Sequence, residues 1–559
     1  MAPRRTPDLG KTLRRRFGHE TLRPGQADVL FSVLTGRNVL AIMPTGAGKS
    51  LCFQLPGLDL PGTTVVVSPL IALMKDQVDR LVERGVRAAR LDSTLAAGEE
   101  KQVLEELAAG ETEFLYVTPE RLANAGFLAR LEGVEVDLFV VDEAHCISSW
   151  GHDFRPAYLE LGRAIAALGR PPLLALTATA SPEVVEDVRS RLAGGELDVI
   201  DTGVYRPNLD LEVVPAADDE RKLAALGEML AADRGERGSV GPGIVYTATI
   251  AHCELVADHL VALGHSVERY HGRLGRKPRH RAQDRFMSGE VPLVVATNAF
   301  GLGIDKPDIR FVVHYDLPPS ISAYYQEAGR AGRDGEAACC RLLYRRADRA
   351  IQARFAGGRY PRAEDLAAVH RALAGLGESG GEVAAVAEAA GVARSRTQVA
   401  LAALAEEGHA RRSRGTWRPV PAPEDEAAAA VSAAAERYAR RAEDDRDRLA
   451  RIEAYAQTAL CRWRHLLEEL GEALPDASGE DPWERCGHCD NCRRPLARAA
   501  VPAASEGLVT GFEGDLAALE LAVGGAVALP VYGRGTVAEV AGDRVVVAFA
   551  DGEERALAR

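Results

Sequence analysis

The sequence has no uninterrupted apolar stretch that approaches the roughly 18–20 residues needed to cross a bilayer. Its first residues, MAPRRTPDLGKTLRRRFG, are basic but are not followed by the apolar segment of a secretory signal peptide. Both absences argue against a membrane-spanning or secreted protein. We therefore expect a cytoplasmic protein without a membrane partner.

Aromatic residues are also scarce, at 5% of the chain, and the formal net charge is -13. A negative sum argues against a polyanionic partner, because such binding needs Lys and Arg that face phosphates. Local placement matters more than the sum, and arginines cluster within otherwise acidic stretches at 273–285, 394–396, 411–418 and 462–464. Each cluster taken alone is also consistent with a solvated surface.

The chain of 559 residues is longer than one hydrophobic core usually organises, so about three to five domains are expected. Its 47% hydrophobic and 27% charged residues lie near the average of globular proteins. Two successive series of alternating strand and helix patterns indicate two α/β lobes with parallel sheets.

A phosphate-binding loop is indicated in the first lobe by LTGRNVLAIMPTGAGKSLCFQLP. An apolar strand at 38–42 leads into a glycine-rich loop, and a helix begins near Lys49, whose charge suits a nucleotide's β- and γ-phosphates. Ser50 offers its hydroxyl to Mg²⁺, whereas Met43 stands where the general pattern has its first glycine. The loop that faces the phosphates consists of Thr45, Gly46, Ala47 and Gly48.

Two acids follow the short apolar run in VDLFVVDEAH, which has the length and β-branched content of a buried parallel strand. Asp142 at the strand's end is placed to hold Mg²⁺, and Glu143 beside it can orient and deprotonate an attacking water. The position about ninety residues after the phosphate loop makes this pattern specific. We add His145 of the same motif to the catalytic residues.

The segment just after these acids, CISSWGHDFRPAY, concentrates aromatic residues in a chain that has few. Aromatic faces interleaved with arginine suit the stacking of nucleic-acid bases, worth roughly 1–3 kcal/mol per base. The alternative is a packed loop core. The residues assigned to nucleic-acid binding are Trp150, His152, Phe154 and Arg155.

The second lobe repeats the strand and helix pattern from GPGIVYTATIAHCELVADHL onward but has no second phosphate loop. Near its end, YYQEAGRAGRDG places Arg330 and Arg333 three residues apart, on one face of an expected helix. Such a pair suits arginine fingers that reach the transferring γ-phosphoryl group from the facing lobe. A solvated arginine pair is the alternative.

Residues from about 15 to 345 resemble the helicase core of the RecQ family, in superfamily two of the DNA helicases. The motifs that carry the resemblance occur in order: RPGQ, MPTGAGKS, SPLIALMKDQV, TPERL, DEAHCISSWGHDFRPAY, LTATA, ATNAFGLGIDKPDIRFVVHYDLP and QEAGRAGRDG. The resemblance implies ATP-driven 3′ to 5′ movement on single-stranded DNA, with unwinding of duplex, forked or branched DNA in repair and recombination. It also implies association with a bacterial nucleoid.

The resemblance further implies that Arg23 and Gln26 contact the adenine of ATP. His19 departs from the family, which typically has a stacking Tyr at this position. We also assign Gly303 and Asp305, in the motif of the second lobe, to the nucleotide site.

An Ala-rich segment at 360–420 has the helix, turn and helix pattern of a winged helix, with a basic tail that reaches Trp417. Many such units only bind proteins. Where the unit instead binds DNA, arginines at the start of the second helix and on the wing suit phosphates. The arginines assigned to DNA are Arg394, Arg396, Arg411 and Arg412.

A cysteine set follows the long, charge-alternating helices expected at 425–470. Cys486, Cys489 and Cys492 lie at two-residue gaps, and Cys461 completes four thiolates that suit a structural zinc ion with no open position. His488 is a rival ligand. The segment resembles the RecQ zinc-binding module, although in that family the zinc module commonly precedes the winged helix.

The last stretch, GAVALPVYGRGTVAEVAGDRVVVAFADGEERALAR, alternates strands and turns, and it predicts a small β-barrel after a linker at 493–525. It is similar to the Tudor-like tail of UvrD-type helicases, which implies a protein partner; an inert barrel is the alternative. The domain boundaries that we predict are 1–205, 206–350, 360–420, 425–497 and 520–559.

Two other functions remain open at the level of sequence. A DEAH-type RNA helicase would have the same acids, and a DNA translocase without strand separation would share every residue of the two lobes. The aromatic segment and the cysteine set favour a DNA helicase over an RNA helicase.

Overall fold

The computed structural model describes residues 9–148, 155–237, 241–301, 304, 306–357, 360–413, 415–475, 485–493, 523–529, 533–541, 544–549 and 554–558. Among these residues, no helix is both long enough and apolar enough to cross a membrane. The two lobes and the cysteine module belong to one compact unit, and residues 344–456 belong to a second. Each unit is described by itself.

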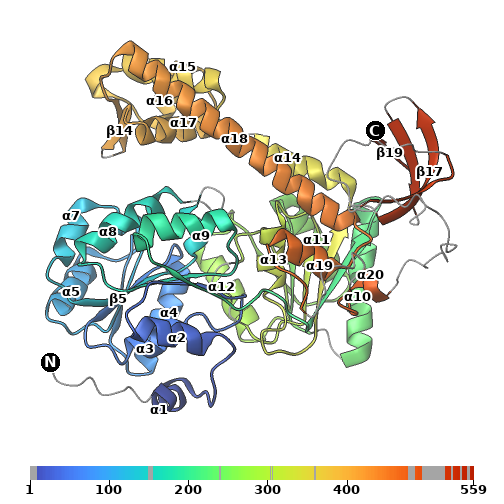
Figure 1. The fold of residues 1–559 in the computed structure, drawn as a ribbon, viewed down its shortest axis with the longest axis horizontal. Helices are drawn as coiled ribbons and strands as arrows, with labels where there is room; N and C mark the ends of the chain where they lie inside the picture. Colours follow the sequence, from blue (N-terminus) through green and yellow to red (C-terminus); the bar gives the residue numbers. More distant parts are fainter. Residues whose placement is uncertain are drawn as a thin grey trace. The chain divides into compact units, whose positions relative to one another are not determined.

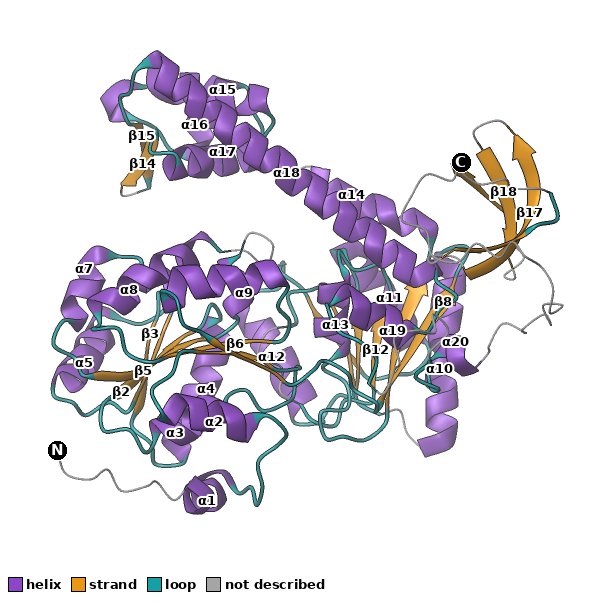
Figure 2. Ribbon diagram, viewed as in Figure 1, coloured by secondary structure: helices purple, strands orange, loops and turns teal. Residues whose placement is uncertain are grey.

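The first lobe is a seven-stranded sheet in the order β3-β4-β2-β5-β6-β1-β7, and its strand pairs run parallel. Figure 2 shows the strands as the central layer of this lobe. The strands are β1 Val39–Ile42, β2 Thr63–Val67, β3 Ala88–Leu91, β4 Phe114–Val117, β5 Val136–Val141, β6 Leu173–Thr177 and β7 Asp198–Asp201.

Helices cover both faces of this sheet (Figure 1), which explains why strands β1, β2, β4 and β6 are buried at every position. In β5, Leu138 and Val140 enter one core cluster while Phe139 and Val141 enter the other. One face is covered by α2 Gln26–Leu34, α3 Leu51–Gly57 and α4 Ile71–Glu83, and the other by α5 Ala97–Ala108, α7 Ala125–Leu128, α8 Leu161–Ala167 and α9 Pro182–Val188.

The second lobe is a six-stranded sheet in the order β10-β11-β9-β12-β13-β8, and the pairs from β10 to β13 run parallel. The strands are β8 Leu209–Pro215, β9 Gly243–Tyr246, β10 Val267–Tyr270, β11 Leu293–Ala296, β12 Phe311–His314 and β13 Ala338–Tyr344. The principal helices are α10 Asp219–Arg237, α11 Ile250–Ala262, α12 Arg276–Met287 and α13 Ile321–Ala328. The expected pair of parallel-sheet lobes is therefore confirmed.

The second unit has three short helices and a hairpin, in the order of a winged helix. These are α15 Ala363–Gly375, α16 Val383–Ala390, α17 Arg394–Glu406, β14 Ala410–Ser413 and β15 Thr416–Pro419. Their core contains Leu366, Leu401 and Trp417, and it is closed by Tyr438 of the long helix α18 Glu424–Gln457. Near its other end, α18 pairs Glu453 with Arg349 of α14 Arg349–Gly357 at 3.1 Å.

The cysteine module contains α19 Arg462–Glu469 and α20 Asp490–Arg493. The C-terminal residues that the structure describes form an antiparallel sheet of β16 Ala526–Leu529, β17 Gly533–Ala541, β18 Arg544–Phe549 and β19 Glu554–Ala558. The expected closed barrel is not confirmed. Most of the linker predicted at 493–525 lies outside the described residues.

Candidate functional site

The phosphate-binding loop connects β1 to α3, and its two glycines take a backbone conformation that other residues rarely adopt. The φ angle is 89° at Gly46 and 84° at Gly48. A tight loop of this kind can direct backbone N–H groups at a phosphate. Lys49 follows the loop and donates from Nζ to the Met43 carbonyl at 3.0 Å. Burial lowers the pKa of Lys49.

The departure from the general loop pattern at Met43 has a packing reason. The Met43 side chain is fully buried in the core beneath the loop. Its sulfur lies 3.8 Å from the sulfur of Cys52 on α3. Met43 therefore anchors the loop to the sheet, and the glycines that shape the phosphate-facing part come after it.

Asp142 and Glu143 lie at the carboxyl end of β5. Burial, followed by the charge of Glu143, raises the pKa of Asp142 to about 7. Glu143 has a left-handed φ of 50°, and its buried Oε2 atom has no hydrogen-bond partner. Two adjacent carboxyl groups, one of which has a buried oxygen without a partner, fit a divalent cation and a water molecule.

His145 joins the acids to the end of β6. Its Nδ1 atom lies 3.0 Å from Thr177 Oγ1 and 3.4 Å from Glu143 Oε2. Burial lowers its pKa to about 3, so the ring is neutral at physiological pH. A neutral ring between these two groups fixes the orientation of the acid motif without adding a charge.

The described end of the aromatic segment contacts the acid motif. Tyr158 donates from its hydroxyl to the Asp142 carbonyl at 2.9 Å. Arg155 donates to the Pro69 carbonyl at 3.3 Å, in the loop between β2 and α4. A movement of this segment would therefore shift the backbone at Asp142. Trp150, His152 and Phe154 lie outside the described residues.

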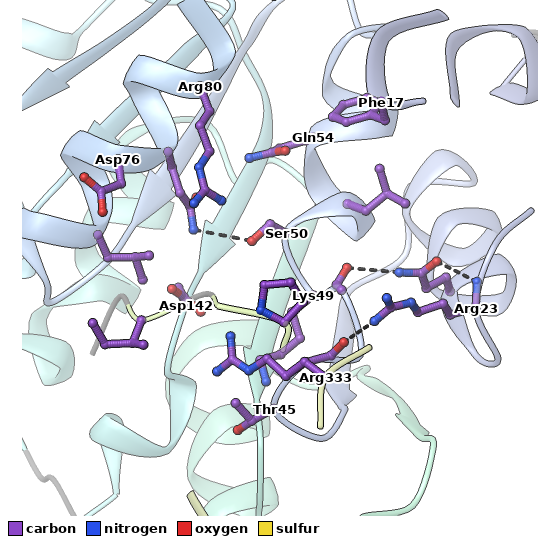
Figure 3. A pocket seen from close by; sticks show the side chains of 18 of the residues that line it. Phe17, Arg23, Thr45, Lys49, Ser50, Gln54, Asp76, Arg80, Asp142 and Arg333 are labelled. Carbon is purple, nitrogen blue, oxygen red and sulfur yellow. Dashed lines mark hydrogen bonds between the residues drawn. The ribbon is translucent and has the colours of Figure 1, made fainter. Parts of the chain in front are cut away.

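Arg23 lies beside the phosphate loop (Figure 3), and Gln26 contacts the same loop. The Gln26 amide donates to the carbonyls of Ala47 at 3.1 Å and Gly48 at 3.0 Å. The Arg23 guanidinium donates to the Gly46 carbonyl. His19 lines the cavity at the edge of the loop. These side chains support the loop itself, and their contact with adenine stays a prediction.

One cavity of about 550 Å³ extends from the phosphate loop and the two acids to the second lobe. Its lining includes Lys49 and Ser50, both acids, and Arg330 and Arg333 of the second lobe. Figure 3 shows Arg333 beside the loop that carries Thr45 and Lys49. A Cβ atom on Gly46 would lie 2.8 Å from Arg333 Cγ, so the arginine packs directly on the loop.

The cysteine cluster is a separate site. The sulfur atoms of Cys461, Cys486, Cys489 and Cys492 all lie within 4.8 Å of one another. Backbone N–H groups donate to three of these sulfurs: Cys486 N to Cys461 at 3.2 Å, Cys489 N to Cys486 at 3.4 Å, and Arg462 N to Cys489 at 3.4 Å. Four converging thiolates suit tetrahedral zinc and leave no position for a substrate.

Three family models match the chain: the DEAD/DEAH box helicase model at residues 23–188, the helicase conserved C-terminal domain at 221–335, and the RecQ zinc-binding model at 427–493. The probable ATP-dependent DNA helicase RecS of Bacillus subtilis is 42% identical over 367 residues, which cover 65% of this chain and 72% of that relative. The chain belongs to the RecQ family.

Other RecQ relatives are longer than the matched part. ATP-dependent DNA helicase RecQ of Bacillus subtilis is 44% identical over 338 residues, which cover 60% of this chain and 56% of that relative. The match thus spans about half the length of the relative. ATP-dependent DNA helicase Q5 of the rat is 43% identical over 355 residues, which cover 36% of its length.

Solved structures share the fold at lower identity. Mycobacterium smegmatis helicase Lhr bound to ssDNA and AMP-PNP has a TM-score of 0.50 at 22% identity, over 77% of this chain and 62% of that one. Mss116p bound to ssRNA and AMP-PNP has a TM-score of 0.52 at 19% identity, over 60% of this chain and 72% of that one. Likeness at these identities establishes the two-lobed fold alone.

The cysteine cluster lies within the match to the RecQ zinc-binding model, and most of the residues that line the cavity between the lobes lie within the two helicase matches. His488, considered as a rival ligand, is not part of the cluster. Its Nε2 atom lies 3.1 Å from the hydroxyl of Tyr205. The ring is therefore engaged with the segment between the lobes.

The prediction that Arg330 and Arg333 lie on a helix is wrong. Helix α13 ends at Ala328, and both arginines lie in the series of turns that follows. Gly332, between them, has a left-handed φ of 54°. Glycine breaks the helix because it lowers helical stability and permits this conformation. The two side chains nevertheless line the same cavity.

Sequence reasoning missed the contribution of α4 to this cavity. Leu73, Asp76, Gln77 and Arg80 all line it. Gln77 donates from its amide to Ser50 Oγ at 3.3 Å. Their spacing along SPLIALMKDQVDR follows one face of a helix, and that periodicity could have revealed them. Gly303 and Asp305 lie outside the described residues.

The arginines of the winged helix differ in their surroundings. Arg394 begins α17 and is exposed, as are Arg411 and Arg412 on β14. Arg396 instead pairs with Asp365 of α15 at 2.7 Å. Its guanidinium holds two helices of the unit together, so the proposal of DNA binding rests on the three exposed residues.

Proposed function

We propose that the chain is an ATP-dependent DNA helicase that moves 3′ to 5′ along single-stranded DNA and unwinds duplex, forked or branched DNA. The observation that carries the proposal is the packing of Arg333 from the second lobe on the phosphate loop of the first. A nucleotide that contacts both lobes can close them when it binds, and the lobes can open again after hydrolysis.

The geometry supports the following roles at the nucleotide. Lys49 and the glycine loop bind the phosphates, and Arg23 and Gln26 hold the loop through its carbonyls. Ser50 and Asp142 would hold Mg²⁺, which supplies positive charge at the β- and γ-phosphates. Glu143 orients and deprotonates the attacking water. Arg330 and Arg333 stabilise negative charge on the transferring phosphoryl group.

The segment after the acid motif is the part of the two lobes that we expect to bind DNA. Tyr158 and Arg155 connect this segment to Asp142 and to the loop after β2. Binding of a strand to the aromatic residues would then adjust the acids, which couples hydrolysis to DNA. The direction of travel, a role in repair and recombination, and association with a nucleoid are extensions from the RecQ family.

The test compares stimulation of the ATPase by single-stranded DNA and by RNA of matched length. We expect DNA to stimulate more strongly, and equal or greater stimulation by RNA would overturn the proposal in favour of an RNA helicase. Strand displacement is then measured on duplexes with a 3′ or a 5′ tail. Displacement that requires a 3′ tail supports the proposal, and ATPase activity without displacement would indicate a translocase.

A further inference from the structure

The segment that joins the two lobes, Val204–Asn208, contacts the loop that carries both cavity-lining arginines. Arg206 donates from one guanidinium nitrogen to the Gly329 carbonyl at 2.8 Å and from another to the Gly332 carbonyl. Gly329 directly precedes Arg330, and Gly332 directly precedes Arg333. One planar side chain therefore spans the two backbone positions from which the arginines project.

Asn208 holds the same loop from its other end. Its side-chain amide donates to the Gly332 carbonyl at 2.8 Å and to the Glu336 carbonyl at 2.9 Å. Its own carbonyl accepts from Ala338 N at 3.0 Å, at the start of β13. A Cβ atom on Gly332 would lie 2.5 Å from the Asn208 amide nitrogen. Gly332 thus permits both the left-handed turn and the close approach of Asn208.

The loop needs such support because it contains three glycines. Gly329, Gly332 and Gly335 have no side chains to pack, and glycine loses the most conformational freedom on folding. The loop's backbone is also attached through Gly332 N, which donates to the Ile309 carbonyl at 2.8 Å, and through Asp334 N, which donates to the Pro307 carbonyl at 3.2 Å. Without Arg206, the Gly329 carbonyl would lose a charged donor next to Arg330.

The same joining segment is held on its other side by the cysteine module. Val204 N donates to Glu472 Oε2 at 2.9 Å. The Tyr205 ring lies edge-on to Trp463, with ring centres 5.0 Å apart. Trp463 in turn donates from its indole nitrogen to the Leu209 carbonyl at 3.1 Å. The joining segment therefore lies between the cysteine module and the arginine loop, in contact with both.

We propose that Arg206 is a positioning residue for Arg330 and Arg333, and that the segment Val204–Asn208 links the docking of the cysteine module to the geometry of those arginines. The inference rests on the proposed function, because it concerns the rate at which the same cavity hydrolyses ATP. A planar guanidinium suits this task, since it can donate to two carbonyls at fixed separation, which the single ammonium of lysine does less well.

The test uses the full chain with saturating single-stranded DNA. Arg206→Gln should lower kcat by about tenfold or more, because displacement of a catalytic group by about 1 Å can cost 10²-fold. The KM for ATP, the affinity for a fluorescent ATP analogue and the melting temperature should change little. Arg206→Lys should recover part of kcat.

Arg341→Gln is the matched control. Arg341 donates to Glu212 Oε2 at 2.5 Å and joins β13 to β8 in the same lobe, away from the arginine loop. This variant should keep kcat even where it lowers the melting temperature. If Arg206→Gln keeps kcat, or if both variants lose it in proportion to stability, the positioning role is wrong. An inactive wild-type chain would instead contradict the proposed function.

A second pair of variants tests the link to the cysteine module. Glu472→Ala removes the acceptor for Val204 N, whereas Glu472→Gln keeps an acceptor oxygen at the same place. We expect the alanine variant to lower kcat, by a smaller factor than Arg206→Gln, and the glutamine variant to stay near the wild type. Equal kcat values for the two Glu472 variants would remove the cysteine module from the proposal.

Discussion

The nucleotide cavity, where we propose that Mg²⁺ binds, and the cysteine cluster differ in how their polar atoms are satisfied. The cavity leaves Glu143 Oε2 buried without a hydrogen-bond partner and holds Asp142 at a raised pKa of about 7. The cysteine sulfurs accept backbone N–H groups and converge on one point. A site that must release its nucleotide can leave polar atoms without partners until the nucleotide binds. A site that holds a fold together has its sulfur ligands already oriented around one point.

The largest expected effect lies at the cysteine cluster. Cys489→Ser should unfold the module at 461–493, because structural zinc sites contribute on the order of 10–16 kcal/mol of apparent binding free energy. Limited proteolysis and zinc content would measure the loss. A normally folded variant without zinc would contradict the contrast between the two sites.

At the nucleotide cavity, Glu143→Gln should lower kcat by about 10²–10⁴-fold, the usual contribution of a general base. Affinity for ATP should persist, because the phosphate loop and Lys49 are unchanged. Steady-state hydrolysis and binding of a fluorescent ATP analogue give the two quantities, and the melting temperature should fall little. Retained turnover would remove Glu143 from its role as base.

A smaller effect is expected from Gly46→Ala. The new Cβ would lie 2.8 Å from Arg333 Cγ at a φ of 89°, which combines backbone strain of about 1–3 kcal/mol with a clash against the second lobe. Gly36→Ala is the control, since its φ is 78° and no atom lies within 4 Å of its Cβ position. Both should lower the melting temperature, but only Gly46→Ala should also lower kcat. Equal kcat values would mean that the lobes do not need this contact.

The smallest effect concerns pH. Burial lowers the pKa of His145 to about 3, below its ordinary value of 6.5. Between pH 6.5 and pH 3, the imidazole of His145 is protonated in the unfolded chain but stays neutral in the folded chain. The stability that this group contributes is therefore present above pH 6.5 and is lost as the pH falls toward 3. His145→Gln should reduce the fall in unfolding free energy between pH 7 and pH 5, measured with urea. An unchanged slope would contradict a buried neutral ring.

Much of the nucleotide site could be predicted from the sequence because its signals are local. The phosphate loop and the acid motif each occupy fewer than about ten consecutive residues at the end of a buried strand, where neighbours in sequence are neighbours in space. The same reasoning located the four cysteines. Arg330 and Arg333 line the cavity, but on turns after a helix that ends at Ala328, because glycine at positions 329, 332 and 335 disfavours a longer helix.

The remaining parts depend on contacts between distant residues. Arg206 reaches carbonyls more than 120 positions away in the chain. Backbone acceptors carry no side-chain signature, so nothing near RPNL in the sequence indicates its partners. The pairing of Arg396 with Asp365 joins side chains on two helices, 31 positions apart in the chain, and the pattern of neither helix indicates it. Only the folded winged-helix unit shows that Arg396 forms an ion pair within the unit, whereas Arg394 is exposed.

Helix α18 has a consequence for how the second unit tolerates change. Its 34 residues, Glu424–Gln457, run without interruption and include both Tyr438, in the winged-helix core, and Glu453, which pairs with α14. An α-helix advances by about 1.5 Å and rotates by about 100° per residue. One inserted residue between these two anchors would swing one end around the axis by more than a quarter turn, whereas seven would restore the phase and only lengthen the rod. Relatives that vary in length here should therefore do so in steps of about seven residues.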